Sequence, residues 1–106
     1  MNKFMRMLVF FDIPVKTPEQ RHAATAFRNF LLKDGYIMMQ YSVYSRVCNG
    51  MDSVNKHRAR LDDALPVNGS VRLLVITEKQ YETMEILLGD FVEDDTTFPC
   101  EQLSTF

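Results

Sequence analysis

Residues 6–14 read RMLVFFDIP, and this stretch decides the fold. Its valine and two phenylalanines favour a strand, and the run is apolar on both faces, which predicts a central strand covered on both sides. The strand ends at Ile13, because the residue before a proline is pushed into extended geometry and Pro14 has no N–H to donate to a neighbouring strand. Asp12 therefore lies at the mouth of a buried strand.

An aspartate in this place has two interpretations. A carboxylate that a strand end holds in place, while solvent and metal can still reach it, is well placed for catalysis. Aspartate also caps turns that lead into helices, by bonding to nearby backbone groups. The local sequence leaves both interpretations open.

A helix is predicted directly after this strand. Thr17 is its expected N-cap, Pro18 suits the first helical position, and Gln20 is placed for a capping box. Gly35 supplies the left-handed residue that ends the helix. A core-facing stripe at helical spacing is formed by Ala23, Phe27, Phe30 and Leu31.

The middle of the chain predicts further elements. Residues 36–47 are too many for one strand and are expected to bend or break near Gln40. Asp52 or Ser53 can cap a second helix, which Pro66 closes. Residues 71–77 form a strongly β-forming strand, and Thr77 caps a short helix over 78–88.

The last residues differ in character from the rest. Residues 91–95 are an acidic connector, and residues 98–106 could add a short edge strand that pairs with another subunit's sheet. We therefore divide the chain into a ferredoxin-like domain at 1–90 and, at 91–106, an acidic connector with a C-terminal edge strand.

The order of elements predicts an α+β fold of the ferredoxin-like type, with a mainly antiparallel sheet and helices on one face. The other face of the sheet is then open, and an open apolar face predicts a homodimer formed through it. The apolar residues expected on this face are Leu8, Phe10, Met39, Tyr41, Val43, Leu73 and Val75.

Composition excludes several classes of protein. The 106 residues are 46% hydrophobic and 25% charged, which is ordinary for one globular domain. No apolar run is long enough for a membrane span and no signal-peptide pattern is present, so no membrane partner is expected. Cys48 and Cys100 are the only cysteines and lack CxxC spacing, which favours reduced thiols and a cytoplasmic location.

Charge is distributed unevenly along the chain. Residues 1–60 hold ten bases and four acids, a balance of +6, whereas residues 61–106 hold two bases and ten acids, a balance of −8. Such a chain can present a basic face to phosphate, although small domains also segregate charge by chance. The candidate nucleic-acid contacts, whose alternative role is a solvated surface, are Arg21, Arg28, Arg46, Lys56, Arg58 and Arg60.

Familiar catalytic motifs are absent from the sequence. It has no Gly-rich phosphate loop, GxSxG or HExxH, and neither His22 nor His57 has an obvious partner, so both are expected to be surface or helix histidines. Asp12 is therefore the best candidate for metal chemistry. Magnesium takes one or two carboxylates together with waters and substrate phosphates, so two Asp12 side chains of a symmetric dimer could share one ion and support attack on a phosphodiester.

Three motifs resemble one known family, the CRISPR-associated protein two family. Residues 5–14, MRMLVFFDIP, are similar to its opening strand, residues 40–44, QYSVY, to its second-strand signature, and residues 71–80 to its third strand and turn. The resemblance covers nearly the whole chain in the same order. The segments FLLKDGY at 30–36 and TEKQY at 77–81 look most like members from systems with a Cas9-type effector.

The resemblance implies a ferredoxin-like homodimer in which Asp12 faces its symmetry mate and a magnesium ion, with manganese as the alternative ion. It implies a metal-dependent endonuclease acting on single-stranded RNA or double-stranded DNA. It also implies a place in spacer acquisition, where the dimer bridges dimers of the integrase subunit and supports the protospacer duplex. Members often carry a tyrosine where this chain has Phe11, and some carry an arginine at about the place of Met38. These departures favour the scaffold role over the nuclease.

An unrelated hypothesis is a regulatory ferredoxin-like dimer that binds a small ligand. It would need neither a metal ion nor a partner subunit, and this requirement distinguishes it from both the nuclease and the scaffold.

Overall fold

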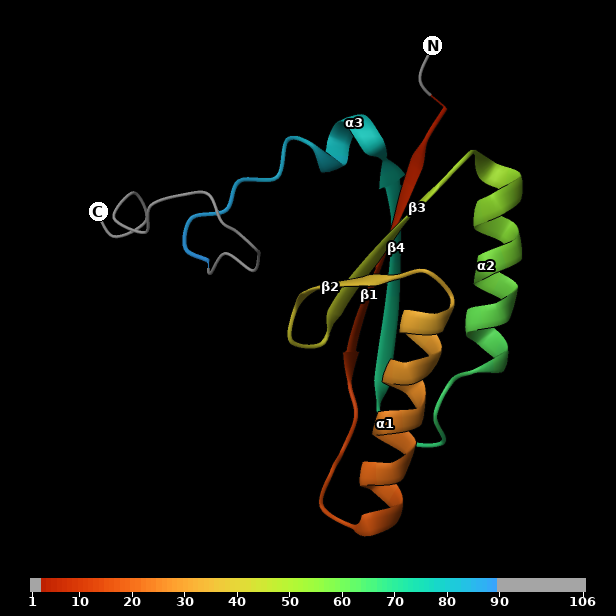
Figure 1. Ribbon diagram of the computed structural model, residues 1–106, viewed down its shortest axis with the longest axis vertical. Coiled ribbons are helices and arrows are strands. Elements are labelled where there is room, and N and C mark those ends of the chain that lie inside the picture. The colour runs from red at the N-terminus through yellow and green to blue at the C-terminus, as the bar shows by residue number, and fades with distance from the viewer. Residues whose placement is uncertain (1–2, 90–106) are drawn as a thin grey trace.

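The computed structural model describes residues 3–89. Its elements are β1 (Met5–Asp12), α1 (Pro18–Lys33), β2 (Ile37–Gln40), β3 (Val43–Cys48), α2 (Met51–Asp63), β4 (Ser70–Thr77) and α3 (Glu78–Tyr81). The strands form one antiparallel sheet in the order β2-β3-β1-β4 (Figure 1). This arrangement confirms the predicted α+β, ferredoxin-like fold, with β1 central.

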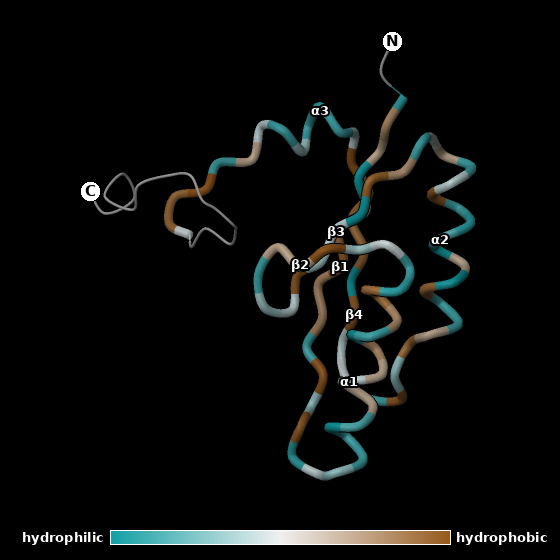
Figure 2. Tube along the Cα trace, in the orientation of Figure 1, coloured by the Kyte–Doolittle hydropathy of each residue, from teal (hydrophilic) through white to brown (hydrophobic). Residues whose placement is uncertain are grey.

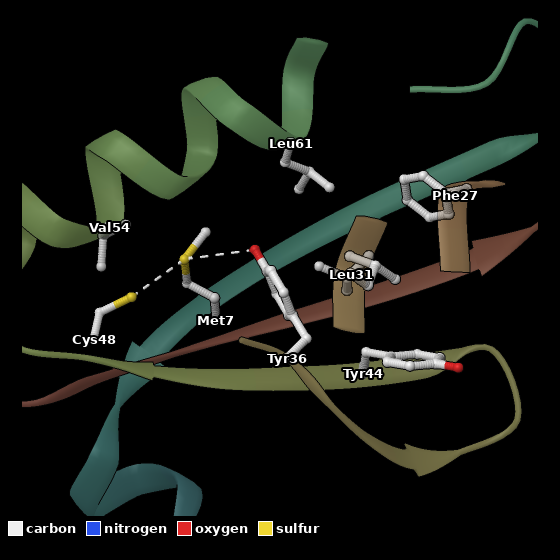
Figure 3. Packing of buried hydrophobic residues seen from close by; sticks show 9 residues of the cluster. Met7, Phe27, Leu31, Tyr36, Tyr44, Cys48, Val54 and Leu61 are labelled. Atoms are coloured by element: carbon white, nitrogen blue, oxygen red, sulfur yellow. Dashed lines mark hydrogen bonds between the residues drawn. The ribbon is translucent and has the colours of Figure 1, made fainter. Parts of the chain in front are cut away.

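Helices α1 and α2 cover the same face of this sheet. One cluster of buried side chains joins both helices to β1 and β3 (Figure 3), and it comprises Met7, Val9, Phe27, Leu31, Tyr36, Tyr44, Cys48, Val54 and Leu61. Burial of an apolar side chain of this size contributes about 1.5–3 kcal/mol. The cluster is therefore what holds the two helices on this face.

Two sulfur contacts lie inside the cluster. The hydroxyl of Tyr36 donates to Sδ of Met7 at 3.9 Å, and the thiol of Cys48 donates to the same sulfur at 3.5 Å (Figure 3). Burial, with a smaller effect from the nearby Asp34, raises the pKa of Tyr36 to about 12. Cys48 is a free, buried thiol, as predicted, whereas Cys100 lies outside the described residues.

Helix α1 begins and ends as its sequence predicts. The hydroxyl of Thr17 accepts from the backbone N–H of Gln20 at 3.1 Å, and the side chain of Gln20 accepts from the backbone N–H of Thr17 at 3.0 Å. Gly35 follows the helix with φ 96°. The break predicted near Gln40 is also present, as a bulge between Met38 and Gln40 and a turn that separates β2 from β3.

Two predictions about helix ends are wrong. Helix α2 has Gly50 at its N-cap and no side-chain cap, so neither Asp52 nor Ser53 caps it. Helix α3 has the predicted Thr77 cap but ends at Tyr81 instead of residue 88. The apolar residues beyond it stay exposed and extend away from the sheet (Figure 2), so nothing within residues 3–89 supplies the packing that a longer helix needs.

The open face of the sheet is apolar, as predicted, but β4 contributes different residues. Leu73 and Val75 pack against the core beneath the helices, so Leu74 and Ile76 occupy the open face instead. The prediction for β4 is wrong by one residue, and in a strand a shift of one residue moves every side chain to the other face of the sheet. Tyr41 lies in the β2–β3 turn instead of on the open face.

Helices cover β1 on one face only within residues 3–89. Phe10, which points to the open face, is 37% exposed, so the predicted cover on both sides is not provided by this part of one chain. In the same part of the chain, no helix combines the length and apolarity that crossing a membrane requires. The division at residue 90 stays a prediction, and the expected connector and edge strand lie outside the described residues.

Candidate active site at the end of β1

Asp12 is the last residue of β1 and is exposed to solvent. Its neighbour Phe11 points toward the helices, where its ring lies 5.2 Å from that of Phe27 and 5.6 Å from that of Tyr44. Because side chains alternate along a strand, Asp12 points to the open face. The apolar anchor at Phe11 thus holds a carboxylate at the rim of an apolar surface.

The start of β4 fixes the backbone on one side of Asp12. Ser70 lies directly opposite Asp12, and the preceding Gly69 has φ 112°. A β-carbon at Gly69 would lie 2.7 Å from the backbone oxygen of Asp12 and 3.1 Å from the α-carbon of Ile13. Only glycine allows this approach without a shift, so Gly69 is part of what positions the carboxylate.

The turn between β2 and β3 fixes the other side. The backbone N–H of Phe11 donates to the backbone oxygen of Ser42 at 3.0 Å. Ser42 has φ 67°, and the preceding Tyr41 is almost fully exposed. The end of β1 is therefore held between two turns, and its carboxylate has no partner among the described residues.

Asp12 supplies one carboxylate, which is only part of a metal site. Residues 3–89 contain no group of three or more histidine, cysteine, aspartate or glutamate side chains that could hold an ion. Magnesium does not need such a group, since it keeps several waters and shares substrate phosphates. A single exposed carboxylate therefore fits half of a site that a second copy of the chain would complete.

The six predicted basic residues lie on three elements, and only some of them have structural partners. Arg28 on α1 and Lys56 and Arg58 on α2 are exposed, and no partner for them exists within residues 3–89. Arg21 donates to the backbone oxygens of residues 15 and 16, both at 3.2 Å. These side chains are available to phosphate, and their role in binding stays a prediction.

The other two basic residues belong to a polar cluster around Asp34 that the sequence did not indicate. Arg46 donates to the backbone oxygen of Asp34, and Nε of Arg60 lies 3.4 Å from Oδ1 of the same residue. Nδ1 of His57 lies 2.8 Å from Oδ2, and this pair is nearly enclosed, with side chains 8% and 6% exposed. His57 thus lies on a helix, one of the two predicted alternatives, but it is buried and paired with Asp34, whereas His22 is exposed on α1.

The helical period could have indicated the burial of His57. It follows the buried Val54 by three residues and precedes the buried Leu61 by four, so all three share one face of α2. Its partner Asp34 comes from the end of α1, which no local pattern reveals.

A second ion pair lies at the opposite end of the open face. Nε and Nη2 of Arg6 contact the two carboxylate oxygens of Glu78 at 2.8 and 2.5 Å, and the guanidinium lies 3.9 Å from the ring centre of Tyr81. The hydrogen bond to Glu78 raises the pKa of Arg6 above its ordinary value. These contacts attach α3 to the sheet.

A shallow, mostly apolar pocket lies beside the segment that follows Asp12. It is lined by Ile13, Pro14, Glu19, Gln20, Ala23, Val67 and Asn68, and its volume is about 150 Å³. Small-molecule sites usually measure about 300–1,000 Å³. The pocket therefore gives no support to the hypothesis of a small-ligand regulator.

Comparison with known proteins finds a family that matches the part of the chain containing Asp12. A model of the family described as "CRISPR associated protein Cas2" matches residues 5–84. The matched region begins with β1 and ends just after α3, so it includes Asp12 and all four strands.

Several curated relatives are similar over most of the chain. The "CRISPR-associated endoribonuclease Cas2" of Acidovorax ebreus is 56% identical over 80% of this chain and 83% of its own length. The protein of the same name from Campylobacter jejuni is 47% identical over 86% of this chain and 64% of its own length. The protein of the same name from Ligilactobacillus salivarius is 43% identical over 85% of this chain and 89% of its own length.

Proposed function

Because the chain belongs to the family of CRISPR associated protein Cas2, we propose that it is a nuclease subunit of a CRISPR system and that Asp12 is the centre of its active site. The observation that carries the proposal is an exposed carboxylate fixed by the end of the central strand, on a face that the helices leave open. The names of these three relatives, all endoribonucleases, favour RNA over DNA as the substrate. The form of RNA that we propose is the single strand, which the family resemblance implies.

The active unit in this proposal is a homodimer formed through the open face of the sheet. Its two-fold axis would bring the two Asp12 carboxylates together, and these two side chains would hold a magnesium or manganese ion. When bound, the ion supplies Lewis-acid activation of the phosphate and of water. The chain's own part is to hold each carboxylate at the rim of the interface, through Phe11 on the helix side and Gly69 on the β4 side.

The reaction is hydrolysis of a phosphodiester. The oxygen of a water molecule bonds to phosphorus, the bond from phosphorus to the departing sugar oxygen breaks, and that oxygen takes up a proton. Asp12 contributes oxygen ligands and negative charge at the place where the ion is needed.

The same dimer serves in spacer acquisition, where it bridges dimers of the integrase subunit and holds the protospacer duplex in the cytoplasm. Support comes from the exposed, unpartnered cations on the helix side of residues 3–89, Arg28, Lys56 and Arg58, which a duplex backbone could neutralise. Two segments, 30–36 and 77–81, further suggest a system with a Cas9-type effector.

Replacement of Asp12 by asparagine tests the nuclease. We expect Asp12→Asn to reduce magnesium-dependent cleavage of a labelled single-stranded RNA by at least a hundredfold, because the amide cannot replace an anionic ligand. Asp62→Asn, at an exposed position on α2, is the matched control and should cleave like the parent protein. Full cleavage by Asp12→Asn, or cleavage unaffected by EDTA, contradicts the proposal. If the nuclease proposal is contradicted but Asp12→Asn still assembles with the integrase and duplex, only the scaffold role is supported.

A further inference from the structure

One end of the sheet brings an exposed aromatic ring and an exposed cation to the two sides of Asp12. Strands β1 and β2 end here, and β3 and β4 begin here. Tyr41 lies in the β2–β3 turn, Asp12 at the end of β1, and Arg72 near the start of β4. The three residues therefore follow one another across the sheet, with the carboxylate in the middle.

Arg72 faces the same side of the sheet as Asp12. Ser70 lies directly opposite Asp12, and Arg72, two residues further along β4, lies opposite Phe10. Such diagonal neighbours are about 7–8 Å apart, which a long side chain can span.

The charge of Arg72 has no structural use within residues 3–89. Its guanidinium has no hydrogen-bond or ion-pair partner there. Arg6, the other arginine that β1 and β4 place on this face, is instead held by both oxygens of Glu78. Within residues 3–89, Arg72 is thus a cation without a partner, diagonally across from Asp12 on the same face of the sheet.

Tyr41 adds a free ring on the other side. It is 87% exposed, and no ring contact or hydrogen bond engages its side chain within the described part of the chain. The bond from Phe11 to Ser42 at 3.0 Å keeps the turn about one strand spacing, roughly 4.8 Å, from the end of β1. The backbone that carries the ring is therefore held near the end of β1, and the exposed ring does not contribute to the core.

We propose that Arg72 binds a phosphate of single-stranded RNA beside Asp12, and that Tyr41 stacks on a base of the same strand. This inference rests on the proposed nuclease function and assigns the substrate contacts of that site. An exposed aromatic ring recognises an unpaired base through its face, which a duplex hides, and a guanidinium pairs with phosphate through two parallel hydrogen bonds. The two contacts together would guide the strand across Asp12.

Binding is measured in EDTA, by fluorescence anisotropy of a labelled single-stranded RNA, so that the result does not depend on cleavage. We expect Arg72→Ala to weaken binding about tenfold and Arg72→Lys to recover part of the loss, since lysine keeps the charge but not the paired donors. Lys33→Ala, at an exposed lysine in the last turn of α1, is the control and should retain at least half of the affinity.

The ring of Tyr41 is tested in the same way. Loss of one stacked base is expected to weaken binding about tenfold in Tyr41→Ala, whereas Tyr41→Phe should bind like the parent protein because it keeps the ring. Binding of double-stranded RNA should not change in Tyr41→Ala. An equal loss for both forms of RNA contradicts stacking on an unpaired base.

The remaining outcomes separate this inference from the proposed function. In magnesium, Arg72→Ala should raise KM for cleavage more than it lowers kcat. If Arg72→Ala instead changes the mass of the protein in solution while single-stranded RNA binding stays intact, the arginine belongs to the subunit interface and the inference is wrong. Cleavage that survives Asp12→Asn would remove the proposed function but leave the binding results to decide the contacts of Arg72 and Tyr41.

Discussion

Asp34 is a nearly enclosed carboxylate that contacts residues of both α2 and β3. It follows the last residue of α1, and its side chain and backbone oxygen together meet His57 and Arg60 of α2 and Arg46 of β3. Charged groups that are nearly enclosed are costly unless they are paired, so each partner needs the others. The cluster therefore ties α1 and α2 to β3.

Removing this carboxylate is expected to destabilise the fold. We predict that Asp34→Ala lowers the free energy of unfolding by about 3 kcal/mol, because it leaves the nearly enclosed His57, together with Arg60, without their anionic partner. Urea unfolding followed by circular dichroism measures the change. The matched control is Asp62→Ala, whose exposed side chain should matter by no more than about 0.5 kcal/mol. A loss below about 1 kcal/mol for Asp34→Ala would show that solvent satisfies these partners.

At the scale of elements, the turns beside β1 position the site more than β1 itself does. The strand ends with an exposed carboxylate, but its backbone is fixed by the β2–β3 turn at Ser42 and by Gly69 at the start of β4. Gly69 combines a positive φ with a close approach to the backbone of Asp12. Gly50 has a similar φ of 115° but has nothing within 4 Å of the place where a β-carbon would lie.

Alanine substitutions at these two glycines distinguish the cost of backbone strain from the cost of steric contact. We predict that Gly50→Ala costs about 1 kcal/mol of stability, from the left-handed backbone alone. Gly69→Ala should cost more and should also slow cleavage, because the new methyl group displaces the backbone oxygen of Asp12. Thermal unfolding and RNA cleavage are measured on both variants. Equal effects of the two variants on stability and cleavage would mean that Gly69 does not position the carboxylate.

At the scale of the whole molecule, the main feature to explain is the apolar face of the sheet that residues 3–89 leave uncovered. Ile37, Val47 and Leu74 lie on this face and are 59%, 44% and 49% exposed. They come from three different strands, so together they form a continuous surface and not isolated side chains. A second copy of the same face would cover it and bring two Asp12 residues toward one another.

A charge placed in this face is expected to separate the proposed dimer. Leu74→Lys should give a single protomer of about 12.4 kDa in sedimentation experiments, where the parent protein gives twice that mass. Its far-ultraviolet circular dichroism should stay unchanged, since Leu74 is half-exposed. Val67→Lys, at a loop residue that is 94% exposed, is the control and should sediment like the parent protein. A Leu74→Lys variant that keeps the parent mass would place the subunit contact elsewhere.

The local parts of this fold were predictable because their causes are local. Thr17, Gln20 and Gly35 determine the ends of α1 through bonds and dihedral angles within a few residues, and the bulge before Gln40 follows from the length of that region. The end of α3 was not predictable in this way, because a helix continues only where something covers its apolar side. The prediction of which β4 residues lie on the open face was also wrong. Leu73 and Leu74 are both apolar, and only strand pairing decides which one faces the helices.

The sequence by itself determined the α+β class, the position of Asp12 at the end of a central strand and the apolar character of the sheet, because strand and helix periods and the proline stop act over short distances. Only the tertiary structure decided which residues surround that carboxylate. Strand pairing brings Gly69 against the backbone of Asp12 and places Arg72 diagonally across from it, and Asp34 meets His57 through the packing of two helices. Such contacts depend on register and packing between distant segments, which no local pattern encodes.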